Sequence, residues 1–243
     1  MQYKFTYPHI DNFCDFGKMT DYSIIYTDFT GNLNNFLNQD LAINTHLSFC
    51  IARSLSARMS DPAIRYHTPF HICSMFQFYQ EKIMPLNGNV PFLSLAQQLA
   101  IWFHDAIYVV KSGSPRNERN SVKFMESLLD NVIDEGILWE AGKIIEATSY
   151  HFDDNPAILV DANLILDIDL CNFAFDFENY QRTSLCVRKE YPEVSDEAFE
   201  ARRKDILRAL IKKGSLYRTD LFKEHFEQKA QENIQKTLAG SST

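Results

Sequence analysis

The chain has 243 residues, of which 45% are hydrophobic and 23% charged, proportions that are ordinary for a globular protein with a sizeable core. Its net charge of −8 excludes a protein that coats nucleic acid or anionic membrane through a general positive field, without excluding a local basic pocket for one phosphate. Five cysteines without CxxC spacing, the lack of a signal-peptide core and the lack of an apolar stretch of about 18–20 residues predict a cytoplasmic protein that does not enter membranes.

The predicted elements begin after an irregular N-terminal extension, residues 1–34, which is rich in Asn, Asp, Tyr and Phe and shows no clear period. Apolar residues at intervals of three or four predict a helix over about 35–59, ended by Ser60-Asp61-Pro62. Thr68 as N-cap and Pro69 at the first helical position predict a second helix that runs to about Met84.

An almost wholly apolar run, Leu95–Val110, predicts a buried helix, and a loop follows it to residue 119. Further helices are predicted over about 120–129, 135–151, 158–175, 177–190, 196–213 and 220–238, although periodicity leaves a strand within 158–175 open. The chain has no strand-and-turn rhythm, no glycine-rich phosphate loop and no repeat. We therefore expect a single all-α domain over residues 35–243.

His104 and Asp105 are adjacent within the apolar run Leu95–Val110. Burying an ionised carboxylate beside an imidazole is costly unless a cation or a dense set of hydrogen bonds compensates it. The pair therefore needs a partner, and a metal ion is the obvious candidate.

His67 and His71 are four residues apart, but they do not form a simple same-face pair. With Thr68 as N-cap, His67 lies outside the helix and His71 lies on its first turn. His71 is the better ligand candidate because apolar residues anchor its helix; the alternative is a partly buried histidine bonded to a carbonyl group.

Asp161, Asp167 and Asp169 interrupt another apolar run. Helix capping or pairing with an arginine explains one or two of these carboxylates, but three in one run favour a site. His151 lies at a predicted helix C-terminus, where the helix dipole favours a histidine and a ligand role stays open.

The ordered set of motifs resembles the HD-domain superfamily of all-α, metal-dependent phosphohydrolases, and within it a bacterial subgroup of predicted HD phosphohydrolases. The resemblance covers roughly residues 60–235, through RYHTPFHI, WFHDAIY, the NER segment at 117–119, LDIDL, VRKEYPEV and LYRTDLF with the later Glu227 and Asn233. One departure is Arg119, which stands where the subgroup usually has a second acidic residue.

The resemblance implies an HD-domain helical bundle with metal ligands His71, His104, Asp105 and Asp169. It favours Asp169 over Asp167 because related proteins with a D-x-D run use its second aspartate. The residues left for a second metal or its surroundings are His67, His151 and Asp167.

Imidazole and carboxylate donors suit one or two ions of Mn, Fe, Ni, Co or Zn, with Mg a weaker fit. Asp105 is expected to bind one ion or to bridge two. Such an ion lowers the pKa of water and polarises a phosphoryl group. Glu118, in the predicted polar loop, is the best candidate for the general base; its alternative is an ordinary surface glutamate.

Arginines flank the motifs and suit bidentate phosphate contacts, although arginines on helix surfaces are usually only solvated. The candidates are Arg65, Arg116, Arg188 and Arg218. We expect a small phosphoester or a nucleotide as substrate, and the oligomeric state stays open. The alternative functions are a di-iron oxygenase of the HD fold and a non-catalytic nucleotide-binding sensor.

Overall fold

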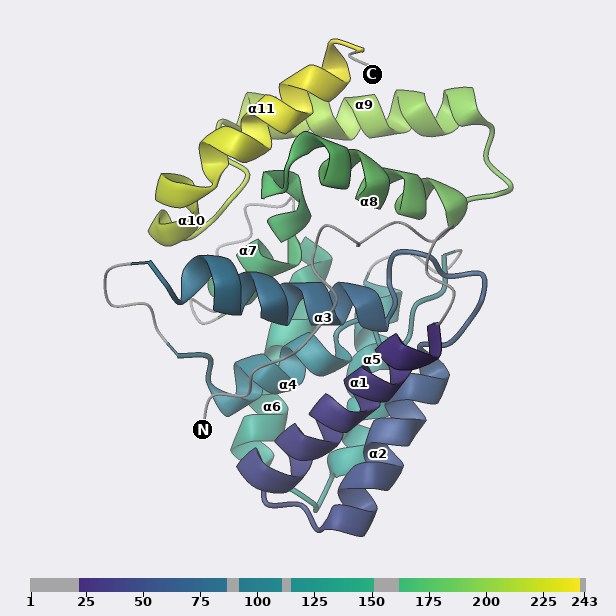
Figure 1. Cartoon of the computed structure of the whole chain (residues 1–243), viewed down its shortest axis with the longest axis vertical. Coiled ribbons are helices and arrows are strands. Elements are labelled where there is room, and N and C mark those ends of the chain that lie inside the picture. The colour runs from purple at the N-terminus through teal and green to yellow at the C-terminus, as the bar shows by residue number, and fades with distance from the viewer. Residues whose placement is uncertain (1–21, 87–91, 111–114, 151–161, 241–243) are drawn as a thin grey trace.

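The computed structural model describes residues 22–86, 92–110, 115–150 and 162–240, and all regular structure in these ranges is helical (Figure 1). The predicted all-α class is therefore confirmed there. The α-helices are α1 (Tyr22–Asn35), α2 (Thr45–Arg58), α3 (Pro69–Phe78), α4 (Leu95–Phe103), α5 (Arg116–Leu129), α6 (Glu135–Ala147), α7 (Asn163–Asp169), α8 (Phe177–Lys189), α9 (Asp196–Lys213), α10 (Asp220–His225) and α11 (Glu227–Leu238).

Helix α3 lies between two groups of helices, as Figure 1 shows. On one side α1 packs against α2, and α4 and α5 pack against α6; on the other side α9 and α10 pack against α11. Helix α3 itself contacts α1, α4 and α7. The start of α3 and the ends of α4 and α7 lie close together, since His71, His104 and Asp169 contact one another there.

The predicted start of α3 is confirmed. The Thr68 side chain accepts a hydrogen bond from the Phe70 amide at 3.3 Å, and Pro69 occupies the first helical position. Nearly every residue of α3 is buried, including His71 on the first turn. A π-helical turn over Tyr79–Ile83 extends the helix almost to the predicted end at Met84.

The prediction of one buried helix over Leu95–Val110 is wrong after Phe103, where α4 ends. Ser94 and Gln97 form a capping box at the start of α4, and the helix ends with His104 as its C-cap. The chain then turns, with the Ala106 amide bonded to the Phe103 carbonyl at 3.0 Å. The run is largely buried through Ala106, whereas Ile107, Tyr108 and Val110 are only partly buried and Val109 is exposed, so apolar composition alone does not continue the helix.

Helix α5 begins at Arg116, so the loop predicted through residue 119 is wrong over its last part. Its first turns hold the segment after Asp105: the Ser121 hydroxyl accepts from the Ile107 amide at 3.0 Å, and the Asn117 side chain accepts from the Val109 amide at 3.2 Å. These side chains replace the backbone bonds that a longer α4 would have made.

Two other predicted helices are interrupted. The one over 35–59 becomes a π-helical turn, Phe36–Asp40, and then α2, whose N-cap Asn44 accepts from the Leu47 amide at 2.9 Å. The last one breaks at Phe226 into α10 and α11. The predictions over 177–190 and 196–213 are confirmed by α8 and α9.

No helix within the described ranges combines the length and the apolar content that crossing a bilayer requires.

The irregular extension predicted for residues 1–34 is helical from Tyr22 onward, and residues 1–21 lie outside the described ranges. Phe29 and Leu33 are fully buried, and the Phe29 ring meets the Trp102 ring edge-on at 5.3 Å between centroids. The four-residue spacing from Phe29 to Leu33 was the helical signal, hidden among polar neighbours.

We expect Phe29→Ala to lower the free energy of unfolding by about 3–5 kcal/mol, because it opens a cavity against Trp102. Urea denaturation followed by circular dichroism measures the change. Asn35→Ala, at an exposed position on the same helix, is the matched control. Equal stability of the two variants would mean that α1 does not belong to the core.

Candidate metal centre

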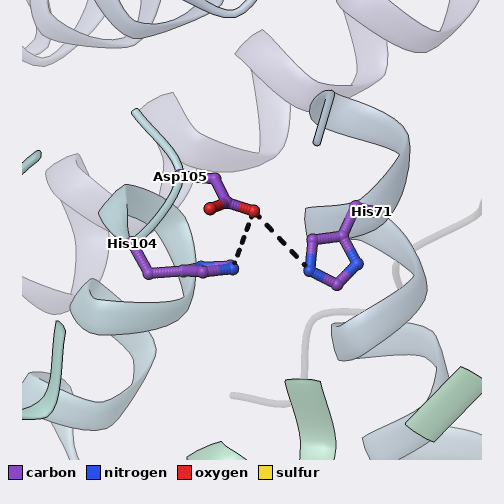
Figure 2. Close-up of side chains that lie close together, drawn as sticks. All are labelled: His71, His104 and Asp105. Carbon is purple, nitrogen blue, oxygen red and sulfur yellow. Dashed lines mark ion pairs between the residues drawn. The ribbon is translucent and has the colours of Figure 1, made fainter. Parts of the chain in front are cut away.

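Three side chains lie close together: His71 on the first turn of α3, and the adjacent His104 and Asp105 at the end of α4 (Figure 2). The Asp105 Oδ2 atom lies 3.1 Å from His104 Nε2 and 3.8 Å from His71 Nε2. One ligand atom from each residue lies within 4.8 Å of the other two. Both histidines are buried and Asp105 is only partly accessible, so this group can hold a metal ion.

Asp169, the last residue of α7, faces the same two histidines. Its Oδ1 atom lies 2.7 Å from His71 Nε2 and 3.5 Å from His104 Nε2. The four residues predicted as ligands are therefore gathered in one place by α3, α4 and α7. Each imidazole presents its Nε2 atom to two carboxylates.

The backbone fixes the orientation of the His104 ring. His104 Nδ1 lies 3.0 Å from the Ile101 carbonyl oxygen, which only a protonated nitrogen can satisfy. The lone pair of the neutral ring therefore belongs to Nε2, which faces the carboxylates. A histidine that binds a metal is typically held in this way through its other nitrogen.

Two atoms of the cluster are buried without a hydrogen bond, His104 Nε2 and Asp105 Oδ2. They lie close together but are not aligned to bond to each other. Unsatisfied buried polar atoms are rare and costly in native proteins. A cation between a nitrogen lone pair and a carboxylate oxygen would satisfy both, so the donor set fits a metal ion.

The charges of the cluster are mutually dependent. Burial raises the pKa of the Asp105 carboxyl, but the positive charges of His104 and His67 outweigh burial and hold that pKa at about 2. For His104 the effect of burial has the opposite sign and lowers the pKa. The carboxylates of Asp105 and Asp169 outweigh burial and raise the pKa of His104 well above its ordinary value. The ionised carboxylates thus demand positive charge, which protons or a divalent ion can supply.

Asp167 has a different environment from Asp169. Its carboxylate accepts hydrogen bonds from the Arg218 amide at 2.8 Å, the Thr219 amide at 2.8 Å and the Thr219 hydroxyl at 2.6 Å. Two residues along a helix are rotated by about 200°, so the two aspartates point in different directions. Asp167 anchors the start of α10, and this contact argues against the predicted place for it at a second metal.

His67 lies outside α3, as predicted, and is held in place by Glu190. Glu190 Oε2 bonds to His67 Nδ1 at 2.8 Å, while Glu190 Oε1 accepts from the amides of Arg65, Tyr66 and His67 at 2.8, 2.6 and 3.1 Å. The His67 ring also stacks on Tyr108, with 3.7 Å between centroids. Glu190 was not singled out in the sequence, although it lies within the motif VRKEYPEV.

The Glu190 carboxyl is buried, which raises its pKa, but the bonds from His67 and from the backbone amides outweigh burial and lower the pKa below its ordinary value. On the other side, burial lowers the pKa of His67, but Asp105 and Glu190 together raise it. Both shifts favour the charged forms of His67 and Glu190, which form an ion pair beside the cluster when His67 is protonated.

Two neighbouring cavities lead to this region. The smaller, of about 210 Å³, is lined by Asp105 and His67 among others. The larger, of about 490 Å³, extends past Arg65 to Val194. The cavities share four lining residues, Asp61, Ile64, Tyr108 and Val109, so they lie next to each other.

The predicted phosphate-binding arginines are placed differently from one another. Arg65 lines the larger cavity, whereas Arg116 and Arg218 line neither of the two. The Arg188 guanidinium donates to Asp196 and to the carbonyl groups of Tyr191 and Val194 at 2.7–2.8 Å. Arg188 therefore holds the connection between α8 and α9, which accounts for its charge without a phosphate.

Glu118 lies in the first turn of α5 and is partly buried, so it is not the loop glutamate that the sequence suggested. It is not part of the group of His71, His104 and Asp105, and its role as a base stays a prediction. His151 and Asp161 lie outside the described residues, and the predictions for them stay untested.

No family model matches the chain, and no curated protein is significantly similar to it.

We expect substitutions of the neighbouring Asp167 and Asp169 to have opposite effects on metal binding and on stability. We expect Asp169→Ala to weaken binding of Mn²⁺ at least about tenfold, with little effect on stability, because it removes a donor from the cluster. We expect Asp167→Ala to lower the free energy of unfolding by about 2–5 kcal/mol and to leave Mn²⁺ binding in place, because it leaves buried donors unpaired. Calorimetric titration and urea denaturation measure the two effects, and a reversed pattern would exchange the two roles.

Proposed function

We propose that the protein is a metal-dependent phosphohydrolase of the HD type, which cleaves a phosphoester of a small molecule or nucleotide. The proposal rests on one observation: His71, His104, Asp105 and Asp169, which three helices supply, lie together in the interior of the protein. A histidine at a helix start, a His-Asp pair and a distant aspartate are the elements of the HD pattern, and here they share one site.

The donor set supports a transition metal. Two imidazole nitrogens and two carboxylates suit Mn, Fe, Ni, Co or Zn, whereas Mg and Ca prefer sites made of oxygen alone. Four donors can hold one ion, or two if Asp105 bridges them. The ion, when bound, lowers the pKa of water and draws electron density from the phosphoryl oxygens.

The chain's own residues orient and enclose the reaction. The Ile101 carbonyl keeps His104 Nε2 directed at the carboxylates, and Glu190 keeps the His67 ring beside Asp105. The smaller cavity gives a substrate access to Asp105. We assign His67 to orienting substrate or water there, and Glu118 remains the candidate base.

Metal analysis together with a substrate panel tests the proposal. Protein purified without added metal is examined by elemental analysis, then loaded with each candidate ion and assayed against phosphomonoesters and nucleotides. Phosphate release that depends on a redox-inert ion supports the proposal. Two bound irons with substrate-dependent oxygen consumption would replace it with an oxygenase, and tight nucleotide binding without turnover would replace it with a sensor.

Substitution of the central pair gives the sharpest expectation. We expect His104→Ala and Asp105→Ala to remove bound metal and to reduce turnover by at least about a hundredfold, because each deletes a donor. The circular dichroism spectrum should stay largely helical. His46→Ala, which changes an exposed histidine on α2, is the matched control and should keep both metal and activity. Full metal content in either variant of the pair would remove the assigned site.

A further inference from the structure

Arg58, an arginine outside the sequence motifs, lines the smaller cavity together with Asp105 and His67. It is in the last turn of α2, and its guanidinium carbon lies 5.7 Å from the centre of the Phe124 ring. Among the described residues Arg58 forms no ion pair. Its guanidinium is thus held against an aromatic ring while its charge has no carboxylate partner there.

A simpler explanation of Arg58 is that a basic side chain stabilises the C-terminal end of α2 through the helix dipole. That effect acts on the stability of the helix and would not change phosphate binding. A second arginine of the same helix serves as a control for the loss of an exposed charge. Arg53 is also exposed and also lies over an aromatic ring, Phe49, at 5.8 Å. Arg53 is not among the residues that line either cavity. The two arginines differ in what they face and in position, since only Arg58 is in the last turn of α2.

The volumes of the cavities indicate which part of a ligand each one accepts. Sites for whole small molecules typically measure about 300–1,000 Å³. The larger cavity, at about 490 Å³, falls in this range, whereas the smaller, at about 210 Å³, falls below it. The smaller cavity therefore fits one end of a ligand, and that end lies beside Asp105.

The charges around the smaller cavity indicate the chemistry of that end. Its acidic side chains are Asp105 and Asp61, and Asp61 Oδ1 already accepts from the Ala63 amide at 2.8 Å. The carboxylates alone would repel an anion. A divalent ion bound at Asp105 would neutralise the Asp105 carboxylate. The guanidinium of Arg58 would then offer the cavity a planar donor group that suits phosphate oxygens.

We infer that Arg58 positions the phosphoryl group of the substrate in the smaller cavity, opposite Asp105, while the rest of the substrate occupies the larger cavity. This assignment rests on the proposed function. Arg58 acts by holding phosphate oxygens and takes no part in binding the metal. The cavity accepts phosphate when the divalent ion is present and rejects it when the ion is removed.

Binding of inorganic phosphate to the Mn²⁺-loaded protein tests the inference, with paramagnetic broadening of the phosphorus NMR signal as the readout. We expect Arg58→Gln to weaken phosphate binding at least about tenfold, since a neutral amide replaces a bidentate cation. Arg58→Lys should lose part of the affinity, because an ammonium group keeps the charge but not the fork of donors. Arg53→Gln should bind phosphate within about twofold of the parent protein, because Arg53 lines neither cavity.

Measurement of Mn²⁺ affinity on the same samples keeps the possible failures apart. Unchanged phosphate affinity in Arg58→Gln, with metal-dependent activity intact in the parent protein, would overturn the role of Arg58 and leave the phosphohydrolase in place. Loss of Mn²⁺ in Arg58→Gln would also overturn it, because the arginine would then act through the metal site. Lack of Mn²⁺ binding in the parent protein would instead overturn the proposed function.

Discussion

Two carboxylates lie against the Nε2 atoms of two buried imidazoles, and the surrounding structure depends on how their charge is balanced. Asp105 and Asp169 contact both His71 and His104 at 2.7–3.8 Å. Carboxylates at such a depth are costly without compensating positive charge. The same electrostatic demand raises the pKa of His104, and the group can hold a metal ion.

The polar contacts around the cluster each fix one of its segments. The Ile101 carbonyl orients His104, and the Asn117 and Ser121 side chains of α5 hold the chain after Asp105. Asp167 ties α7 to the start of α10, so that Asp169 keeps its direction. Buried hydrogen bonds of this kind restrict the positions of the donors before any ligand arrives.

Local patterns predicted the parts of the fold and the site that depend on neighbouring residues. The cap at Thr68 placed His71 correctly on the first turn of α3, and the helical spacing of α8 and α9 was readable. The early end of α4 could not be predicted from the residues around it, because the chain after α4 is held by Asn117 and Ser121 of another helix. Glu190 was missed for the same reason: its partners, His67 and the amides of Arg65 to His67, lie more than a hundred residues earlier in the chain.

Glu190 also joins two parts of the molecule mechanically. One of its oxygens accepts three successive backbone amides of the connection between α2 and α3, and the other holds the His67 ring. Glu190 directly follows α8 and itself lines the larger cavity, next to Lys189 and Tyr191. A wall of the larger cavity and a histidine that lines the smaller one are therefore connected through a single carboxylate. We expect a displacement of the α8–α9 connection to change the position of His67, because Glu190 bonds to its ring.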